Sequence, residues 1–381
     1  MKRKALVIIG IVLGVLVLAV ILIWPAAPLW ARLGAKPMCI QGSWPKIKFV
    51  SCLQTITTQV QSTALPTLIG QAPIPIIVDD DGSPDGVIAL LYFLRNPLYD
   101  VRAITISSGE AHPDLFAPQM INLLTELGRA DIPVGAGRAS PLEGSNAFPD
   151  PWRQASDGFW ELALPQTPTP SEPRQAAELI EETLSNSTYP IMIFVSGTHT
   201  NLAEALRLDP SISEHISGVY VMGGSIYVPG NIESDWPSIH NRVAEWNIWV
   251  DPVAADAVFT FGLPLHLIPL DATNQVTWTE ADALSWASSA TSEGVFAADI
   301  LSWMLRSWST DNAYIWDLAA AVVMNDPRLC PEVPLAVDVV VEEGSEQGRT
   351  IVGDGTANTL VCLEPDVEQV KLNVADILGQ P

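Results

Sequence analysis

The chain has 381 residues, of which 43 are Asp or Glu and 19 are Lys or Arg, so its formal net charge is −24 at pH 7. Such an acidic surface repels phosphate backbones and anionic lipid, which excludes nucleic-acid binding through a basic patch. Hydrophobic residues make up 48% and charged residues 16% of the chain, which excludes a disordered or fibrous protein. We expect a globular domain with an additional apolar segment.

The apolar segment lies at the start of the chain. Residues 5–24 contain no charge and no strongly polar side chain, and a helix of this length spans a bilayer core of ~30 Å. The basic tip at residues 1–4 is expected to stay cytoplasmic, with the rest of the chain outside the membrane. We therefore predict a single-pass signal anchor. The alternative is a cleaved signal peptide, which would make the protein secreted.

The four cysteines fall into two local pairs, Cys39 with Cys52 and Cys330 with Cys362. An exported domain meets an oxidising environment, so we predict two disulfides with this pairing, although four cysteines allow three connectivities. The alternative is four unrelated core thiols. Zinc is not expected, because no C-x-x-C motif or nearby His pair offers ligand spacing.

Residues 25–72 are mixed in composition and interrupted by Pro, which predicts a stalk, and residues 73–381 form the organised domain. In this domain short runs rich in Val and Ile alternate with segments of helical period. The pattern predicts an α/β fold with a mainly parallel, Rossmann-like central sheet and helices on both faces. The expected strands include residues 74–78, 101–106, 191–195, 218–222 and 265–270. Residues 336–355 are expected to form a hairpin that ends the fold.

Ligands of open parallel sheets bind beyond the carboxyl ends of the strands. The loop at residues 79–86 follows the first expected strand and carries four carboxylates, at Asp79, Asp80, Asp81 and Asp85. Such a density of negative charge is costly without a cation, so a hard metal such as Ca²⁺ or Mg²⁺ is the natural occupant. In the alternative interpretation Asp85 caps the following helix and the other carboxylates are solvated.

Three further segments carry polar residues just after an expected strand or at the start of an expected helix. They are residues 196–201, residues 222–224 with 244–247 after them, and Asp317 at the start of an apolar helix. Each loop is a weak signal alone. Their order along the chain carries the argument.

The ordered motifs resemble those of the inosine-uridine-preferring nucleoside hydrolases. The resemblance covers residues 74–355 without a break in order. Between GNI and AEWNIWVDP the chain has an insertion of about eight residues. The matching segments are DDDGSPDG (79–86), ITISSGE (104–110), GRADIPVGAG (128–137), SGTHTNLA (196–203), VYVMGG (219–224), GNI (230–232), AEWNIWVDP (244–252), PLDAT (269–273) and WDLAAAV (316–322).

The resemblance implies an enzyme that hydrolyses the N-glycosidic bond of a ribonucleoside and holds a tightly bound Ca²⁺. By motif position Asp81 is a calcium ligand and the general base, and Asp317 and the backbone carbonyl of Thr200 are further ligands. A metal-bound water beside a carboxylate base suits attack on a ribose that develops positive charge. The residues expected to bind the substrate are Asp85, Glu110, Met222, Asn231, Glu245, Trp246, Asn247 and Trp316.

Three residues depart from the family pattern. Gly86 replaces a calcium-ligating carboxylate, which weakens the metal site unless Asp80 or Asp79 turns in; an alternative register makes Asp80 and Asp85 the metal pair. Trp316 replaces a His that helps to protonate the leaving base, and an indole stacks but delivers no proton. Glu110 replaces an Asn, and its carboxylate is a candidate substitute for the charge lost at Gly86.

These departures leave a second functional class open. The alternative to the hydrolase is a catalytically impaired homologue that binds nucleosides or ribose at the cell surface. In either case we expect a small-molecule nucleoside as the partner, a membrane contact through residues 5–24 and no nucleic acid, while a homo-oligomer stays open. His199 lies in the second loop, where a role outside the site is at least as well supported as one within it.

Overall fold

The computed structural model describes residues 39–44, 47–52, 72–164 and 173–380. The chain divides into two compact units, Met1–Gln71 and Ala72–Pro381. The expected anchor at residues 5–24 lies outside the described residues. Within the described part, none of the helices combines the length and the apolar composition needed to cross a membrane.

In the first unit the described residues form a hairpin. Strand β1 (Cys39–Trp44) pairs antiparallel with β2 (Ile47–Cys52), and the backbone of Cys39 lies opposite that of Cys52. Side chains of this hairpin are outside the described part, so the disulfide between these two cysteines stays a prediction.

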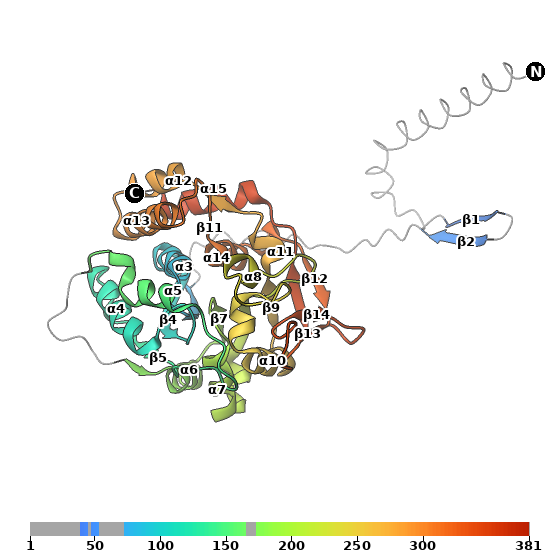
Figure 1. The fold of residues 1–381 in the computed structure, drawn as a ribbon, viewed down its shortest axis with the longest axis horizontal. Coiled ribbons are helices and arrows are strands. Elements are labelled where there is room, and N and C mark those ends of the chain that lie inside the picture. Colours follow the sequence, from blue (N-terminus) through green and yellow to red (C-terminus); the bar gives the residue numbers. More distant parts are fainter. Residues whose placement is uncertain (1–38, 45–46, 53–71, 165–172, 381) are drawn as a thin grey trace, which may run out of the picture. The chain divides into compact units, whose positions relative to one another are not determined.

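The second unit is built on a nine-stranded sheet, shown in Figure 1 with helices around it. Eight neighbouring strands run parallel, and only the edge strand β12 is antiparallel to its neighbour β15. This confirms the mainly parallel sheet predicted from the apolar runs. In spatial order the strands are β12 (Glu332–Leu335), β15 (Thr359–Cys362), β9 (Leu265–Ile268), β8 (Ile216–Met222), β7 (Ile191–Val195), β3 (Ile74–Asp80), β4 (Tyr99–Ile106), β5 (Val134–Ala136) and β6 (Arg174–Gln175).

Alternate side chains of the central strand β3 pack in two separate hydrophobic cores. Ile76 and Val78 belong to one core and Ile77 to the other, and all three are fully buried. Successive side chains of a strand point to opposite faces, so a strand buried on both faces reads as a continuous apolar run. Helices therefore cover both faces of the sheet, as the sequence predicts.

Each core is closed by its own set of helices. The first set contributes to the core of Ile76: α3 (Pro84–Arg95), α4 (Pro113–Glu126), α12 (Glu280–Ala287), α13 (Ser292–Ser307), α14 (Trp316–Asn325) and α15 (Val367–Leu378). The second set contributes to the core of Ile77: α6 (Ala176–Ser185), α7 (Thr200–Leu208) and α10 (Pro252–Thr260). Short helices at the carboxyl edge of the sheet are α5 (Asp150–Asp157), α8 (Ile232–Asp235), α9 (Trp246–Val250) and α11 (Leu270–Thr273).

The C-terminal region differs from the expectation in one respect. Strands β13 (Val337–Val339) and β14 (Thr350–Val352) form the expected antiparallel hairpin. The hairpin does not end the fold, because β15 then enters the main sheet between β12 and β9 and α15 packs on the first core. The four residues of β15 are too few to stand out as an apolar run.

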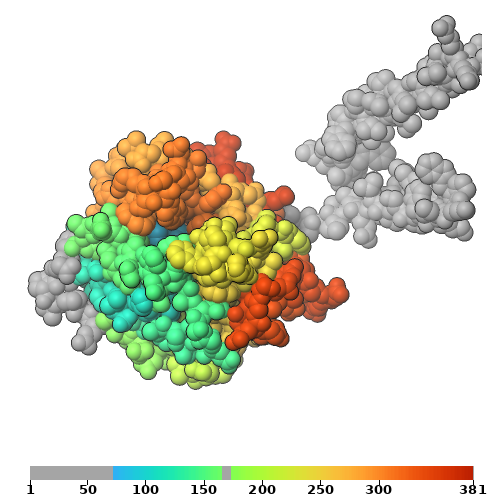
Figure 2. Space-filling model, in the orientation of Figure 1, coloured from blue at the N-terminus to red at the C-terminus, as the bar shows by residue number. Residues whose placement is uncertain are grey.

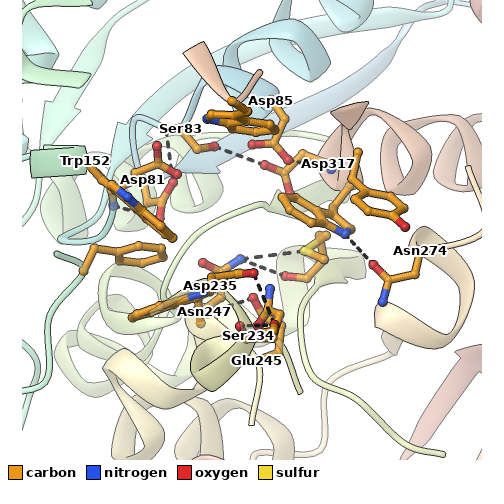
Figure 3. Close-up of a pocket in the computed structure, with 18 of the residues that line it drawn as sticks. Asp81, Ser83, Asp85, Trp152, Ser234, Asp235, Glu245, Asn247, Asn274 and Asp317 are labelled. Carbon is orange, nitrogen blue, oxygen red and sulfur yellow. Dashed lines mark hydrogen bonds between the residues drawn. The ribbon is translucent and has the colours of Figure 1, made fainter. Parts of the chain in front are cut away.

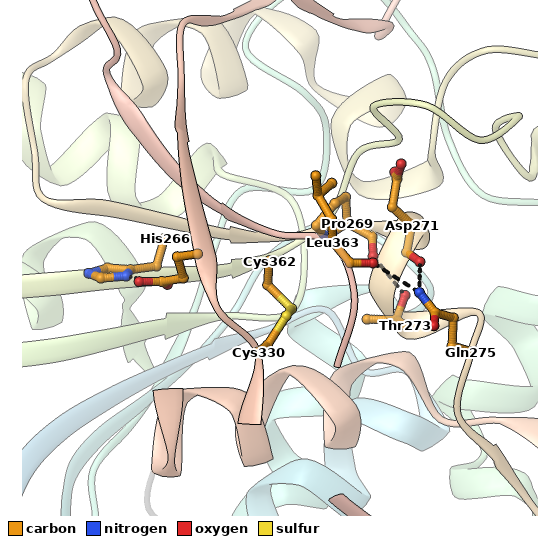
Figure 4. Close-up of a disulfide and its surroundings, with 9 residues drawn as sticks. His266, Pro269, Asp271, Thr273, Gln275, Cys330, Cys362 and Leu363 are labelled. Carbon is orange, nitrogen blue, oxygen red and sulfur yellow. Dashed lines mark hydrogen bonds and ion pairs between the residues drawn. A yellow bond between two sulfur atoms is a disulfide. The ribbon is translucent and has the colours of Figure 1, made fainter. Parts of the chain in front are cut away.

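A disulfide between Cys330 and Cys362 fastens this region and confirms the second predicted pair. The sulfur atoms are 2.06 Å apart, and both residues are fully buried. Figure 4 shows the bond linking the last residue of β15 to the segment just before β12. The disulfide therefore links the antiparallel edge strand β12 covalently to its neighbour β15 in the nine-stranded sheet.

Candidate active site

Asp81 follows β3 directly and is held by two backbone amides. Ser83 N donates to one carboxylate oxygen at 3.2 Å and Glu110 N to the other at 3.1 Å. Two glycines make room for this carboxylate, since a Cβ at Gly109 would lie 2.2 Å from it and a Cβ at Gly197 would lie 2.6 Å from the Asp81 Cβ. The three strand ends at β3, β4 and β7 therefore enclose one buried acid.

Asp85 and Asp317 meet across the first turns of α3 and α14. Asp317 N donates to the Asp85 carboxylate at 3.3 Å, and the Ser83 hydroxyl donates to the Asp317 carboxylate at 3.2 Å. Ser83 also caps α3 by accepting from Gly86 N at 3.0 Å. The N-termini of both helices favour negative charge, which helps to place two carboxylates side by side.

Glu245 and Asn247 form the opposite side of the site. Glu245 caps α9 and accepts backbone hydrogen bonds from Gly224 and Asn247, both at 2.9 Å. The Asn247 amide donates to the carbonyls of Ser196 at 3.2 Å and Met222 at 3.3 Å. These bonds tie the short helix α9 to the ends of β7 and β8, so its polar side chains have fixed positions.

Asn231 contributes a polar atom without a protein partner. Its Oδ1 is buried and accepts no hydrogen bond, although the residue lines the same cavity. A buried acceptor left unpaired costs roughly 1–3 kcal/mol. A ligand hydroxyl or amine beside it would recover that energy.

Two aromatic groups flank the carboxylates. On one side Trp246 stacks on Phe148, with ring centroids 4.9 Å apart, and lies 5.5 Å from Trp152. On the other side Trp316 stacks on Tyr314 with centroids 5.5 Å apart, and its indole N–H donates to Asn274 at 2.8 Å. Figure 3 shows Trp152 near Asp81, and Asp85 next to Asp317.

All these groups line one cavity of about 860 Å³ at the carboxyl edge of the sheet. In Figure 2 the segments that contribute to it, coloured green, yellow and orange, come together on the face shown. The volume is within the range of sites that enclose small molecules. Of the residues expected at the site, those lining the cavity are Asp81, Asp85, Glu110, Met222, Asn231, Glu245, Trp246, Asn247, Trp316 and Asp317.

Burial dominates the electrostatics of the cavity. It raises the pKa of Glu245 to about 7, against the hydrogen bonds from the backbone of Asn247 and Gly224. Burial followed by the charge of Asp80 raises the pKa of Asp81 well above its usual value, and burial followed by the charge of Asp85 does the same for Asp317. Among the described ion pairs none includes these acids. The acids thus repel one another, and the buried Arg153 interacts electrostatically with Asp81 without forming an ion pair with it in the described part of the chain.

Comparison with known proteins identifies the fold and its family. A model of the family described as inosine-uridine preferring nucleoside hydrolase matches residues 76–371. The chain belongs to this family. The chain is 31% identical over 284 residues to a pyrimidine-specific ribonucleoside hydrolase of Citrobacter koseri, covering 73% of this chain and 88% of the relative. This nucleoside hydrolase chain is accordingly an enzyme of the ribonucleoside hydrolase class.

Solved structures agree with this assignment. A plant nucleoside hydrolase matches with a TM-score of 0.71 and 26% identity over 81% of this chain and 100% of the other. A purine-preferring ribonucleoside hydrolase from Gardnerella vaginalis matches with a TM-score of 0.71 and 25% identity, over 80% and 98% of the two chains. The relatives differ in the base they prefer, so the family leaves the base preference of this nucleoside hydrolase open.

The carboxylates of the nucleoside hydrolase cavity suit a hard cation in chemistry. In the described ranges no group of three or more His, Cys, Asp or Glu side chains is arranged to hold a metal ion. Nonetheless, several buried carboxylates without a positive partner are the donors that Ca²⁺ prefers, and a cation would relieve the burial and repulsion that raise their pKa values. The acids therefore have the chemistry that calcium prefers, but in the described residues no three of them are gathered around one point.

Four residues considered for the site do not line the cavity: Asp79, Asp80, His199 and Thr200. Thr200 is buried at the start of α7, where its hydroxyl donates to Asp251 at 2.6 Å. Asp80 is fully buried, and its carboxylate accepts from Gly82 N at 2.7 Å. His199 is fully buried beside Phe259, its ring nitrogens have no hydrogen-bond partner, and burial lowers its pKa to about 4. His199 therefore belongs to the core and not to the site.

Residues that line the cavity but were not predicted from the sequence include Ser83, Phe148, Trp152 and Asp235. Ser83 lies in the acidic loop and bridges α3 to Asp317, so its place beside the acids was a usable signal. Phe148, Trp152 and Asp235 come from segments with no strand-end signal, and only the packing of α5 and α8 brings them to the cavity. The indole N–H of Trp246 donates to Asp235 at 3.2 Å, which fixes that ring.

Proposed function

We propose that this protein hydrolyses the N-glycosidic bond of ribonucleosides to ribose and a free base. The observation that carries the proposal is the convergence of Asp81, Asp85, Asn247 and Glu245 in one cavity between two aromatic groups. Acidic and amide side chains match sugar hydroxyls, and indole rings match the faces of a base. The family and its relatives support this reaction.

The ribose would bind to the polar side chains around the acids. Asp85 and Glu245 would accept hydrogen bonds from hydroxyls, while Asn247 and the unpaired Oδ1 of Asn231 would complete the set. Glu110 and Met222 also line the cavity and would contact the sugar. Sites that pair buried polar groups with substrate hydroxyls discriminate strongly against analogues that lack them.

Asp81 would act as the general base. Its carboxylate is fixed by two backbone amides, and burial followed by the charge of Asp80 raises its pKa, which makes it a stronger base towards water. The negative charge of the surrounding acids would stabilise the ribosyl cation that develops as the base departs.

Calcium would be held by Asp81, Asp317 and the backbone carbonyl of Thr200. Bound there, the ion would supply positive charge that lowers the pKa of a water and orients the sugar hydroxyls. Because the cavity acids form no ion pair in the described part of the chain, the ion would also balance their charge.

The leaving base would stack on the indole rings. Trp246 and Trp316 both line the cavity, and neither indole is an acid at ordinary pH. Protonation of the base would then depend on solvent. This departure, together with Gly86, is what supports the alternative of an impaired binding homologue.

Ribose release is the experiment that separates the two functions. Purified residues 71–381 would be incubated with a panel of purine and pyrimidine nucleosides, with Ca²⁺ or with EDTA. The hydrolase predicts ribose release that EDTA abolishes. A folded protein that is stabilised by nucleosides but releases no ribose would support the binding homologue.

We also propose that residues 5–24 anchor the protein in a membrane, with the enzyme domain on the extracytoplasmic side. The apolar run and the basic tip support this location, and the Cys330–Cys362 disulfide is typical of oxidising compartments. Fusing a reporter active only outside the cytoplasm to the C-terminus tests it. An inactive reporter would contradict the proposal.

A further inference from the structure

The wall of the cavity carries acids and no basic residue. In the part of the chain that the structure describes, six carboxylates line the cavity, and no Lys, Arg or His side chain does. Arg153 is buried nearby and interacts electrostatically with Asp81, but its guanidinium donates to the Ser108 hydroxyl and the Ala111 carbonyl and does not line the cavity. A ligand in the cavity therefore faces negative side chains and no positive one.

Asp235 brings one of these carboxylates to the aromatic side of the cavity. The residue lies in α8, within the insertion that separates GNI from AEWNIWVDP. It is exposed, and its carboxylate accepts from the Trp246 indole N–H and from the Ser234 hydroxyl, both at 3.2 Å. A carboxylate offers about four acceptor positions, so these two bonds leave it able to contact a ligand. Neither bond involves an acid expected to hold calcium, so the charge of Asp235 is available to the substrate.

Aromatic rings line the same cavity in number. Trp152, Trp246, Trp303 and Trp316 are among them, and two more rings, those of Trp308 and Tyr314, are 43% and 38% exposed. The face of an aromatic ring attracts a cation, because the electron density of the ring is highest there. Aromatic faces and carboxylates together recognise a flat organic cation better than a neutral ring of the same size.

The residue at position 316 favours the same kind of ligand. A neutral base leaves as an anion unless an acid protonates it, and the Trp316 indole is no acid at ordinary pH. A base that already carries a positive charge needs no proton, because its ring nitrogen becomes neutral when it takes the electron pair of the C1′–N bond. Tryptophan in place of a proton donor is therefore no disadvantage for such a substrate.

We propose that the preferred substrates are ribosides whose base is a cation, such as pyridinium ribosides and N7-alkylated purine ribosides. Water attacks C1′ and gives a proton to Asp81 while the C1′–N bond breaks, so the products are ribose and a neutral base. The positive charge moves from the base to the ribose in this step, and the cavity acids face it throughout. This inference rests on the proposed function, because it names the substrate class of the same site.

Ribose release by the full-length protein at pH 6 with Ca²⁺ tests the inference, using two pairs of ribosides with the same ring size. N-ribosylnicotinamide and 7-methylguanosine carry a cationic base at this pH, and uridine and guanosine are their neutral counterparts. A cationic base also leaves more readily without an enzyme. The deciding quantity is therefore the change, from one protein variant to another, in the cationic-to-neutral ratio of kcat/KM.

Asp235→Asn removes one charge from the cavity, and its amide oxygen still accepts from the Trp246 indole. Glu233→Gln is the matched control, because it removes one charge from the same helix at a residue that does not line the cavity. Trp316→His adds a proton donor, which helps a neutral base to leave and does nothing for a cationic one.

We expect the wild type to favour the cationic member of a pair by at least about tenfold in kcat/KM, Asp235→Asn to lower this ratio by about tenfold, and Glu233→Gln to leave it unchanged. Trp316→His should raise kcat for the neutral member alone. A wild type that prefers the neutral members, an unchanged ratio in Asp235→Asn, or an equal gain for both members in Trp316→His would overturn the inference, while ribose release would keep the proposed function. Absence of ribose release from every riboside would instead refute the proposed function.

Discussion

The Asp85 carboxylate accepts a hydrogen bond from the backbone amide of Asp317 at 3.3 Å, although the two residues are 232 positions apart. The contact joins the first turns of α3 and α14 and sets two acids at the base of the cavity. A neutral amide oxygen at position 85 could accept the same hydrogen bond, although more weakly than a carboxylate. Charge and shape at this position are therefore separable by mutation.

Replacing Asp85 by Asn tests its role in ribose binding. The amide oxygen still accepts from Asp317 N, so the fold is preserved, but the charged acceptor for a sugar hydroxyl is lost. We expect kcat/KM for nucleosides to fall by about 100-fold or more. Steady-state kinetics measure this loss, with Asp354→Asn at an exposed position as the control. Equal kcat/KM in Asp85→Asn and wild type would remove Asp85 from the ribose site.

Replacing Trp316 by His tests whether leaving-group protonation is missing. An imidazole titrates near neutral pH and donates protons, unlike the indole. General acid catalysis is worth about 10²–10⁴-fold, so we expect kcat at pH 6 to rise by about tenfold or more. Trp316→Phe is the control, because it keeps an aromatic face without a titratable group. A histidine variant no faster than the phenylalanine variant would contradict this explanation of Trp316.

His199 predicts an acid-dependent loss of stability. Burial lowers its folded pKa to about 4 from an ordinary value of about 6.5, so its stability contribution is complete above pH 6.5 and is lost as pH falls towards 4. The full loss is about 3 kcal/mol, given 1.36 kcal/mol per pKa unit. Denaturant unfolding of wild type and His199→Phe measures it. The difference between the two proteins should change by this amount from pH 7 to pH 4, and a constant difference would contradict the burial of a neutral imidazole.

Two buried acids, Asp80 beneath the strand end and Glu245 in the cavity lining, predict the opposite pH dependence in calcium-free protein. Burial raises the pKa values of Asp80 and Glu245 to about 7, so the stability that their neutral forms contribute is present at pH 4 and is lost as pH rises through 7. Calcium should offset this loss. We expect the calcium-induced rise in Tm, measured by differential scanning fluorimetry against EDTA, to be larger at pH 8 than at pH 5. An equal rise at both pH values would argue that calcium binds away from these acids.

The sequence predicts the centre of the fold because strands buried on both faces appear as uninterrupted apolar runs. Such runs mark β3, β4, β7, β8 and β9. The outer strands β5 and β6 have three and two residues, and β12 is partly exposed, so no run marks them. The return of β15 into the sheet depends on long-range packing and on the Cys330–Cys362 bond, which explains why the hairpin before it looked like the end of the fold.

The site residues likewise separate into those that the sequence predicts and those that only tertiary packing reveals. Asp81 and Asn247 are predictable because each adjoins the end of a parallel strand or the short helix tied to it, and such ends meet at one edge of a sheet. Spacing along the chain does not reveal which way a side chain turns. The sequence therefore left open whether Asp79 or Asp80 would replace the carboxylate missing at Gly86, and the contact between Asp80 and Gly86 emerges only in three dimensions. The aromatic packing of Trp152 on Trp246 likewise depends on tertiary structure.

Ribose release by wild type and by Asp81→Asn, with the best nucleoside of the panel and saturating Ca²⁺, tests the central claim most directly. The amide keeps an acceptor for Ser83 N or Glu110 N but cannot take a proton from water. We predict release by the wild type and a loss of about 10²–10⁴-fold in kcat for the variant, the usual contribution of a general base. Equal turnover in the two proteins would contradict the assignment of Asp81 as the base on which hydrolysis depends.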